Sequence, residues 1–207
     1  KKVDRVPVAP FIFNNLIYEF YDACNVDPIE KGIEVYQHFG FDIILRTCNV
    51  GDYLDESSCS SSNWKVEVQK EEQDKEWTIT TVIKTPEKQL VQRKRYHQAT
   101  EYEVLEAVVE YYIKDEDDFE QFVKYQPEVP VYDCSIITRA RALLGEQGLA
   151  APWGQGAFNM VSFYRKLDDL VMDPYINPNF YKRMMEYFSN RMLEAIRQFI
   201  QAGADVI

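Results

Sequence analysis

The chain has 207 residues, 46% hydrophobic and 14% aromatic, which is enough apolar material for a large core and excludes a disordered chain. Its 34 acidic residues against 23 Lys and Arg give a net charge of -11, which disfavours binding to nucleic acids or anionic membranes. The sequence contains neither an apolar run of the roughly 18 residues that a membrane span needs nor a signal peptide at KKVDRVPVAP, so we expect a soluble, cytoplasmic protein.

The first part of the chain predicts the order strand, helix, strand. Residues 4–13 (DRVPVAPFIF) form an apolar run typical of a short buried strand, and residues 16–24 predict a brief aromatic helix. Asp27 and Pro28 are a helix start, and Gly40 fits the C-terminal cap of that helix. Residues 41–45 (FDIIL) are a continuous apolar segment of the kind found in parallel sheets.

The next part is more polar and predicts a solvent-exposed β-hairpin. Residues 57–63 (SSCSSSN) are a small-residue linker, and residues 64–68 and 76–84 alternate apolar with polar side chains. A third strand is predicted at residues 90–96, followed by acidic helices at 101–109 and 115–125. The acidic run Asp115 to Asp118 is interpreted as a solvated helix cap, because consecutive acids on a helix point in different directions.

The last part again predicts alternating helices and strands. A helix at 138–144 precedes a strand at 148–153 (GLAAPW), a glycine loop, Gly154 to Gly156, that we interpret as a turn, and a helix at 157–165. Asp173-Pro174 predicts a turn. Asn177-Pro178 starts a long helix that ends before Gly203, and ADVI starts a fourth strand. Apolar residues at helical spacing form the core stripe of the long helix: Met184, Met185, Phe188, Met192, Leu193, Ile196 and Phe199.

Four parallel-type strands separated by helices predict a repeated βα layout. A (β/α)8 barrel needs eight strands, so we expect residues 1–207 to be the N-terminal part of one barrel domain, continuing beyond Ile207. The hairpin at 63–96 would be an excursion after strand two. If the chain ended at Ile207, the exposed edge of the last strand would favour self-association as a homodimer.

Ligands of parallel α/β sheets bind beyond the carboxyl ends of the strands. That rule selects amides, aromatic rings and one arginine as candidate substrate-binding residues: Asn14, Asn15, Arg46, Asn49, Trp153, Gln155, Phe158 and Asn159, with Tyr164 nearby. No Ser-His-Asp set, Walker-type loop or close carboxylate pair accompanies them. The residues predicted at these strand ends suit a planar or polar organic ligand, but they do not indicate a particular reaction.

Cysteines and histidines are few and scattered. Cys24, Cys48, Cys59 and Cys134 form no C-x-x-C pair, which favours reduced thiols. Neither His38 nor His97 has a second ligand at metal-binding spacing, so no metal site within residues 1–207 is predicted.

The order of motifs resembles the uroporphyrinogen decarboxylase superfamily, which comprises the decarboxylases of haem synthesis and cobamide-dependent methyltransferases. The resemblance covers essentially the whole chain and includes RVPVAPF, GFDIIL, the TP turn after the hairpin and QGAFNMVSFYR. Its most specific part is LVMDPYINPNFYKRMMEYFSNRMLEAIRQFIQAGADVI. The resemblance implies a (β/α)8 TIM barrel with its site at the barrel mouth.

Departures from the decarboxylase pattern indicate the methyltransferase branch. The arginines that hold carboxylates in the decarboxylases fall here on Ile12 and Leu16, and the catalytic Asp falls nearest Asn49. An amide cannot supply the full negative charge that this reaction uses. Only Tyr164 matches a decarboxylase site residue, so the resemblance makes it the candidate catalytic residue, and a packing role is equally compatible. VPVAP and the hairpin that ends in TP look more like the methyltransferases.

The resemblance therefore implies a zinc-dependent enzyme that moves a methyl group between a small methylated substrate or thiol and a corrinoid. Its partners would be a corrinoid protein or free cobalamin, and its zinc ligands, a His-x-Cys and a later Cys, would lie beyond Ile207. Two alternatives stay open. One is a uroporphyrinogen decarboxylase of porphyrin biosynthesis that needs no cofactor, and the other is a non-catalytic barrel used for binding or assembly.

Overall fold

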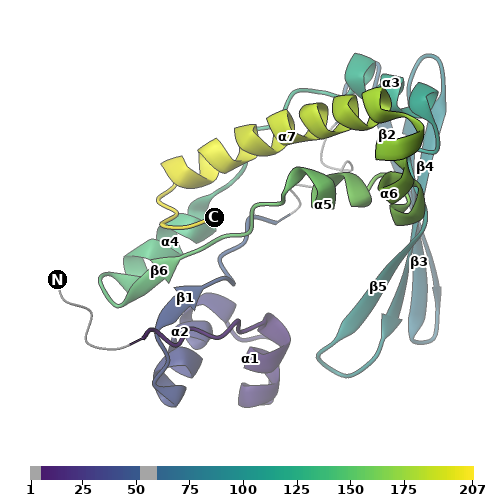
Figure 1. Cartoon of the computed structure of the whole chain (residues 1–207). Helices are drawn as coiled ribbons and strands as arrows, with labels where there is room; N and C mark the ends of the chain where they lie inside the picture. The colour runs from purple at the N-terminus through teal and green to yellow at the C-terminus, as the bar shows by residue number, and fades with distance from the viewer. Residues whose placement is uncertain (1–5, 52–59) are drawn as a thin grey trace. The chain divides into compact units, whose positions relative to one another are not determined.

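The computed structural model describes residues 6–51 and 60–207 (Figure 1). The chain is mixed α/β and divides into two compact units, each described by itself below. The first unit comprises residues 6–51, 131–154 and 195–207 of the described chain, and the second comprises residues 60–130 and 155–194. Within the described residues, the two sheets are a parallel pair and a four-stranded antiparallel sheet, and neither closes into a barrel.

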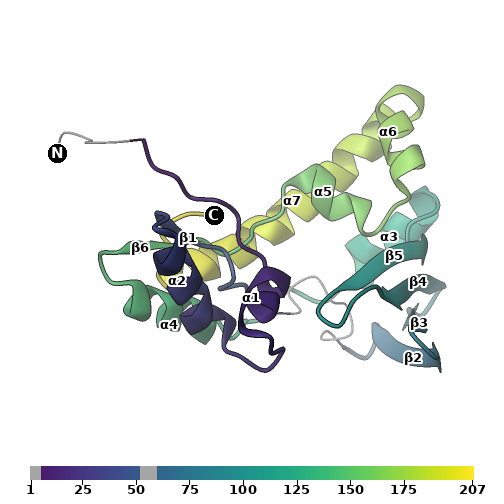
Figure 2. The ribbon, with the colours of Figure 1, turned by 90° about the horizontal axis from the view of Figure 1, so that it is seen from below.

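The first unit is built on the parallel strand pair, with helices beside it (Figure 2). Ile43 pairs with Gly148, Ile44 with Leu149 and Leu45 with Ala150. Its elements are α1 (Asn14–Tyr21), α2 (Pro28–Phe39), β1 (Ile43–Leu45), α4 (Ser135–Leu144), β6 (Gly148–Ala150) and the end of α7 (Pro178–Gln201). The predicted strands at 41–45 and 148–153 are thus present, each shortened to three residues.

The predicted first and fourth strands do not form regular strands. Pro7 and Pro10 lack backbone N–H groups and cannot donate to a ladder, so in the first segment Val8 makes the contact: its carbonyl accepts from Asp42 N at 2.8 Å. At the other end, the N–H of Asp205 donates to the carbonyl of Ala150 at 2.9 Å. Both segments are therefore joined to the parallel pair, the first at the residue before β1 and the last at β6.

Helix α2 begins and ends as predicted. The Asp27 side chain accepts from Ile29 N at 2.9 Å, Pro28 occupies the first turn, and Gly40 has the left-handed φ of +66° that a glycine cap tolerates. The helix buries Val35 and Tyr36 in the core of this unit. The Tyr36 hydroxyl lies 2.7 Å from the Pro10 carbonyl and 3.0 Å from the Ile44 carbonyl, which fixes the Pro-rich segment beside β1.

The second unit contains an antiparallel meander in chain order, which extends away from α3 and α6 (Figure 1). Its elements are β2 (Lys65–Gln73), β3 (Glu76–Lys84), β4 (Gln89–Gln98), β5 (Val104–Glu110), α3 (Glu116–Tyr125), α5 (Ala157–Ser162), α6 (Leu167–Ile176) and α7 to Glu194. Ile83 and Leu90 are buried, whereas β2 is exposed along nearly its whole length. The predicted exposed hairpin and its third strand are confirmed. Of the linker at 57–63, residues 57–59 lie outside the described residues.

Two predictions in this unit are wrong. Residues 101–109 are not a helix: Val104–Glu110 is the fourth strand, since its β-branched residues favour a sheet and Glu106 pairs with Lys94 across β4 at 3.0 Å. Asp173-Pro174 is not a turn but lies inside α6. Pro174 removes one backbone hydrogen bond and crowds the carbonyl four residues earlier, and the helix continues through it with Asp173 held by Arg165.

Helix α7 begins after Asn177, whose side chain accepts from Phe180 N at 3.2 Å. Four residues of the predicted stripe are buried, namely Met184, Phe188, Met192 and Phe199. Leu193 departs from the prediction, because 49% of it is exposed. The buried stripe is therefore narrower than hydropathy alone indicated.

Candidate functional site

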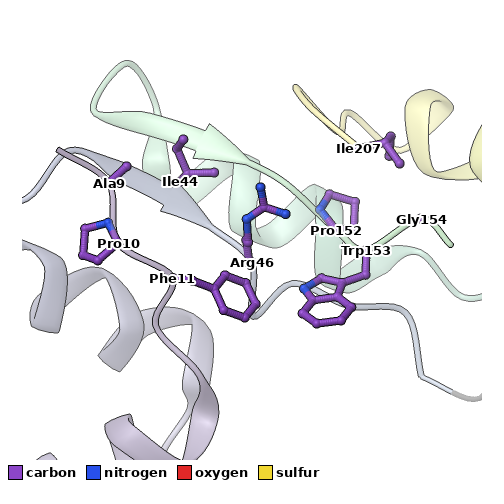
Figure 3. Close-up of a pocket in the computed structure, with 9 residues that line it drawn as sticks. All are labelled: Ala9, Pro10, Phe11, Ile44, Arg46, Pro152, Trp153, Gly154 and Ile207. Atoms are coloured by element: carbon purple, nitrogen blue, oxygen red, sulfur yellow. The ribbon is translucent and has the colours of Figure 1, made fainter. Parts of the chain in front are cut away.

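An open depression of about 550 Å³ lies at the carboxyl ends of β1 and β6 in the first unit (Figure 3). This volume is in the range of small-molecule sites. The lining comes from the Pro-rich segment, the two strand ends and the last residue: Ala9, Pro10, Phe11, Ile44, Arg46, Pro152, Trp153, Gly154 and Ile207. The rule that ligands bind beyond parallel strands therefore leads to a real concavity in this unit.

Two aromatic rings and a guanidinium group define the depression chemically. The ring centroids of Phe11 and Trp153 are 5.4 Å apart, and Arg46 Cζ lies 5.4 Å from the centre of the Phe11 ring. Arg46 follows β1 directly, whereas Trp153 lies three residues beyond the end of β6. Within the described part of the chain, the Arg46 side chain forms neither an ion pair nor a hydrogen bond, so its charge is available to a ligand.

The side-chain amide of Asn49 holds the two strand ends of the depression together and is not free to bind a ligand. Its Oδ1 accepts from the backbone N–H of Trp153 at 2.7 Å, and its Nδ2 donates to the Arg46 carbonyl at 2.9 Å. One side chain thus joins the chain after β1 to the chain after β6. The predicted substrate-binding role of Asn49 is replaced by a bridging one, because both ends of its amide are already bonded.

The other predicted site residues lie elsewhere. Asn14 and Asn15 form the first turn of α1 in the first unit, where Asn15 Oδ1 accepts from Leu16 N at 2.9 Å. Four belong to the second unit: Gln155, Phe158, Asn159 and Tyr164. Of these, Gln155 accepts a hydrogen bond from Asn159, and Phe158 is exposed on α5.

Tyr164 is packed in an aromatic cluster of the second unit. It is only 3% exposed, with its ring centroid 4.6 Å from that of Phe188 and 5.5 Å from that of Phe122. These neighbours account for a large aromatic residue at this position by packing.

Sequence reasoning missed Phe11 and the role of Gly154. The signal for Phe11 was present, since it ends the VPVAPF motif, but the strand was predicted to continue past it. Gly154 has no left-handed φ. A Cβ at Gly154 would collide with Ile207 and approach Ile196 Cδ1 to 3.2 Å, so glycine is needed there for close packing.

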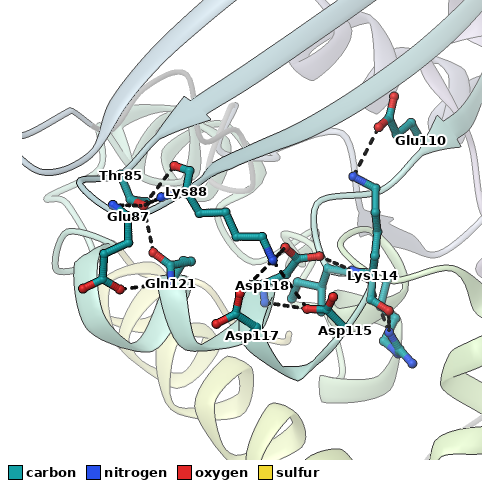
Figure 4. Close-up of polar contacts among 11 residues, drawn as sticks. Thr85, Glu87, Lys88, Glu110, Lys114, Asp115, Asp117, Asp118 and Gln121 are labelled. Atoms are coloured by element: carbon teal, nitrogen blue, oxygen red, sulfur yellow. Dashed lines mark hydrogen bonds and ion pairs between the residues drawn. The ribbon is translucent and has the colours of Figure 1, made fainter.

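The acidic run at the start of α3 is a structural cluster of ion pairs and hydrogen bonds (Figure 4). Asp115 caps the helix as predicted, accepting from Asp118 N at 2.9 Å. Asp118 is not solvated: it is 4% exposed, 2.6 Å from Lys88 Nζ, and accepts from Lys114 N. The pairing with Asp118 and Asp117 raises the pKa of Lys88, and the cluster ties the β3–β4 turn to α3.

Cys48 has the environment of an inert core thiol. It is fully buried, its Sγ donates to the Leu45 carbonyl at 3.1 Å, and burial raises its pKa from 9.0 to about 11. Cys24 is exposed, and Cys134 is a free thiol of intermediate exposure; Cys59 lies outside the described residues.

We expect iodoacetamide at pH 8 to alkylate Cys24 rapidly and Cys48 only after denaturation, because alkylation requires an accessible thiolate. Peptide mass spectrometry of the labelled protein measures both rates. The raised pKa also means that unfolded Cys48 ionises before folded Cys48, so its contribution to stability is lost as the pH rises from about 9 to about 11. Equal labelling of Cys24 and Cys48 in the native state would contradict the structure.

Among residues 6–51 and 60–207, no three His, Cys, Asp or Glu side chains are grouped as metal ligands. His38 and His97 are both exposed, and His97 Nδ1 lies 3.5 Å from a Glu76 carboxylate oxygen. In the same residues, no helix is long and apolar enough to cross a membrane.

Comparison of the chain with family models, curated proteins and solved structures finds no match. A function for the chain can therefore be inferred from the motifs in its sequence and from the geometry of the depression.

Proposed function

We propose that the chain belongs to a barrel enzyme of the uroporphyrinogen decarboxylase type and that it serves methyl transfer between a small substrate and a corrinoid. The order of its parallel segments supports this fold. The segment at Val8 is bonded to the residue before β1, β1 pairs with β6, and Asp205 is bonded to β6. One parallel pair with a further segment bonded on each side is compatible with the strand order of a (β/α)8 barrel.

The observation that carries the proposal is the Arg46 depression, with its two aromatic rings and single cationic side chain. One cation suits a small substrate better than a tetrapyrrole that carries many carboxylates. The positions that hold arginines in the decarboxylases support the same choice. Ile12 is 3% exposed in the hydrophobic core, and Leu16 is a surface residue of α1, and neither can pair with a carboxylate.

The described residues do not fit a zinc site, since they contain no group of ligands and the Cys48 thiol is buried against a carbonyl. Zinc ligands of the proposed enzyme would have to lie outside them. The role of these residues is to bind and orient. Phe11 and Trp153 would hold the apolar part of the substrate, and Asn49 would keep the two strand ends in register.

The test is an assay of the intact, metal-replete protein with cob(I)alamin and candidate methyl donors: methanol, methylamine and an aryl methyl ether. We expect the absorption spectrum of cob(I)alamin to change to that of methylcob(III)alamin, with one donor preferred. Methylcobalamin with a thiol or tetrahydrofolate as acceptor tests the reverse direction.

A parallel incubation with uroporphyrinogen, analysed by chromatography, separates the alternatives. Formation of coproporphyrinogen without methyl transfer would overturn the proposal in favour of the decarboxylase. Inactivity in both assays would favour a binding or assembly barrel.

A further inference from the structure

We propose that the depression binds an organic monoanion with a flat, unsaturated body, its charged group on Arg46 and its body against Phe11 and Trp153. The inference deepens the proposed function, on which it rests, by naming the substrate class: among the candidate donors it favours an aryl methyl ether that also carries one carboxylate. It follows from three observations: an unpaired guanidinium, two exposed rings beside it, and walls that carry no second charge.

The unpaired state of Arg46 is the first step. The protein carries a net charge of -11, and the other arginines and lysines described in the first unit have partners. Lys31 pairs with Glu34, Arg139 with Asp27, Arg141 with Asp205, and Arg197 also has an interaction partner. Arg46 instead lies over the Phe11 ring and forms no ion pair with any other described residue. A guanidinium presents a planar fork of donors that matches a carboxylate.

The shape of the walls is the second step. Phe11 and Trp153 are each 37% exposed, so part of each ring is accessible to a ligand in the depression. Their planes are inclined by 41°, so they form an angled wall instead of a closed stack. The remaining lining is aliphatic or proline: Ala9, Pro10, Ile44, Pro152 and Ile207, with Gly154. An apolar wall next to one cation selects a ligand with one charge and an apolar body.

The position of Arg46 is held by its backbone. The amide of Asn49 bonds its carbonyl, and Leu45 beside it is fully buried. The side chain therefore leaves a fixed point at the end of β1, and replacing it removes no hydrogen bond or ion pair from the described structure. A variant at this position is expected to fold.

The probe is benzoate, titrated into the intact protein by calorimetry, with perturbation of the Trp153 indole signal in NMR as a second readout. The three tryptophans are distinguished by the loss of one signal in Trp153→Phe. We expect Arg46→Gln to weaken benzoate binding about tenfold or more, because a charge-assisted hydrogen bond is removed. Phe11→Leu should weaken it less.

Two matched ligands separate the contributions of ligand charge and ligand shape to binding, and a matched variant controls for the loss of a positive charge on the protein. Benzamide has the shape of benzoate without the charge and should bind the wild-type protein at least about tenfold more weakly. Cyclohexanecarboxylate has the charge without the flat ring and should bind more weakly than benzoate. Lys31→Gln removes the same charge from the exposed ion pair on α2 and should leave benzoate binding unchanged.

Three results would overturn the inference: equal binding of benzoate and benzamide, undiminished binding to Arg46→Gln, or inorganic phosphate competing as well as benzoate does. These outcomes are separate from the failure of the proposed function. Benzoate binding without methyl transfer would support the anion site and contradict the proposed reaction. Methyl transfer without benzoate binding would support the proposed reaction and contradict the anion site.

Discussion

Asp173→Asn is expected to lower the free energy of unfolding by about 3–5 kcal/mol, the loss typical of breaking one side of a buried ion pair. Arg165 and Asp173 are 7% and 5% exposed. The guanidinium donates to the carboxylate twice, Nε to Oδ2 at 2.5 Å and Nη2 to Oδ1 at 2.8 Å. An uncharged amide at residue 173 would leave the buried arginine charge uncompensated, which is the source of the loss.

Arg165 also joins parts of the second unit that are distant in sequence. Its Nη1 donates to the Lys114 carbonyl at 3.0 Å, and its Cζ lies 5.1 Å from the centre of the Phe180 ring. The link between β5 and α3, helix α6 and the start of α7 therefore converge on one side chain. Loss of the Asp173 carboxylate should therefore destabilise the β5–α3 link, α6 and the start of α7 together.

Urea unfolding followed by circular dichroism measures this effect. The control is Asp168→Asn on the same helix, where the carboxylate is 79% exposed and pairs with Lys166; a change of at most about 1 kcal/mol is expected. The double variant Arg165→Met, Asp173→Leu should recover much of the stability, because an apolar pair needs no charge compensation. A loss from Asp173→Asn no larger than that of the control would refute the buried pairing.

Gly148→Ala is expected to cost about 1–3 kcal/mol, as over-packing of a tight contact does. A Cβ on Gly148 would lie 2.6 Å from Ile43 Cβ and 2.8 Å from the Ile43 carbonyl oxygen. Both are atoms of the partner strand at the paired position, so neither can move without separating β1 from β6. The same separation would pull Arg46 and Trp153 apart and weaken ligand binding in the depression.

The measurement combines urea unfolding with the benzoate titration, since the variant should change both. Gly51→Ala is the matched control in the same unit: a Cβ there lies within 4 Å of no other described residue, and its φ is not left-handed. We expect it to be near neutral in both readouts. Unchanged stability of Gly148→Ala would mean that the strands are not paired at this register.

Local signals in the sequence were sufficient for several elements. Asp27, Pro28 and Gly40 bounded α2 correctly because caps and left-handed glycines act within a few residues. The alternation at 76–84 predicted β3 for the same reason. Residues 101–109 were assigned wrongly because the glutamates there favour a helix by intrinsic propensity, and their pairing with β4 was not visible locally.

The site was predictable only in part. The position of Arg46 follows from where β1 ends, and the arginine was selected on that basis. The bridge from Asn49 to Trp153 joins residues 104 positions apart, and no local pattern encodes it. Whether the Arg46 guanidinium has an ion-pair partner likewise depends on residues that are distant in the sequence. The burial of Tyr164 among aromatic rings depends on α3 and α7, which meet it only in the folded unit.

The parallel pair of β1 and β6 encloses a very long stretch of chain, since the whole antiparallel meander and α3 lie between Leu45 and Gly148. The entropy lost on closing such a loop grows only with the logarithm of its length, so a doubling costs about 0.6 kcal/mol. Insertions or deletions at the turns of the meander therefore change very little the entropy that is lost when β1 pairs with β6. The turn between β2 and β3 can vary in length at almost no entropic cost to the register that holds Arg46 beside Trp153.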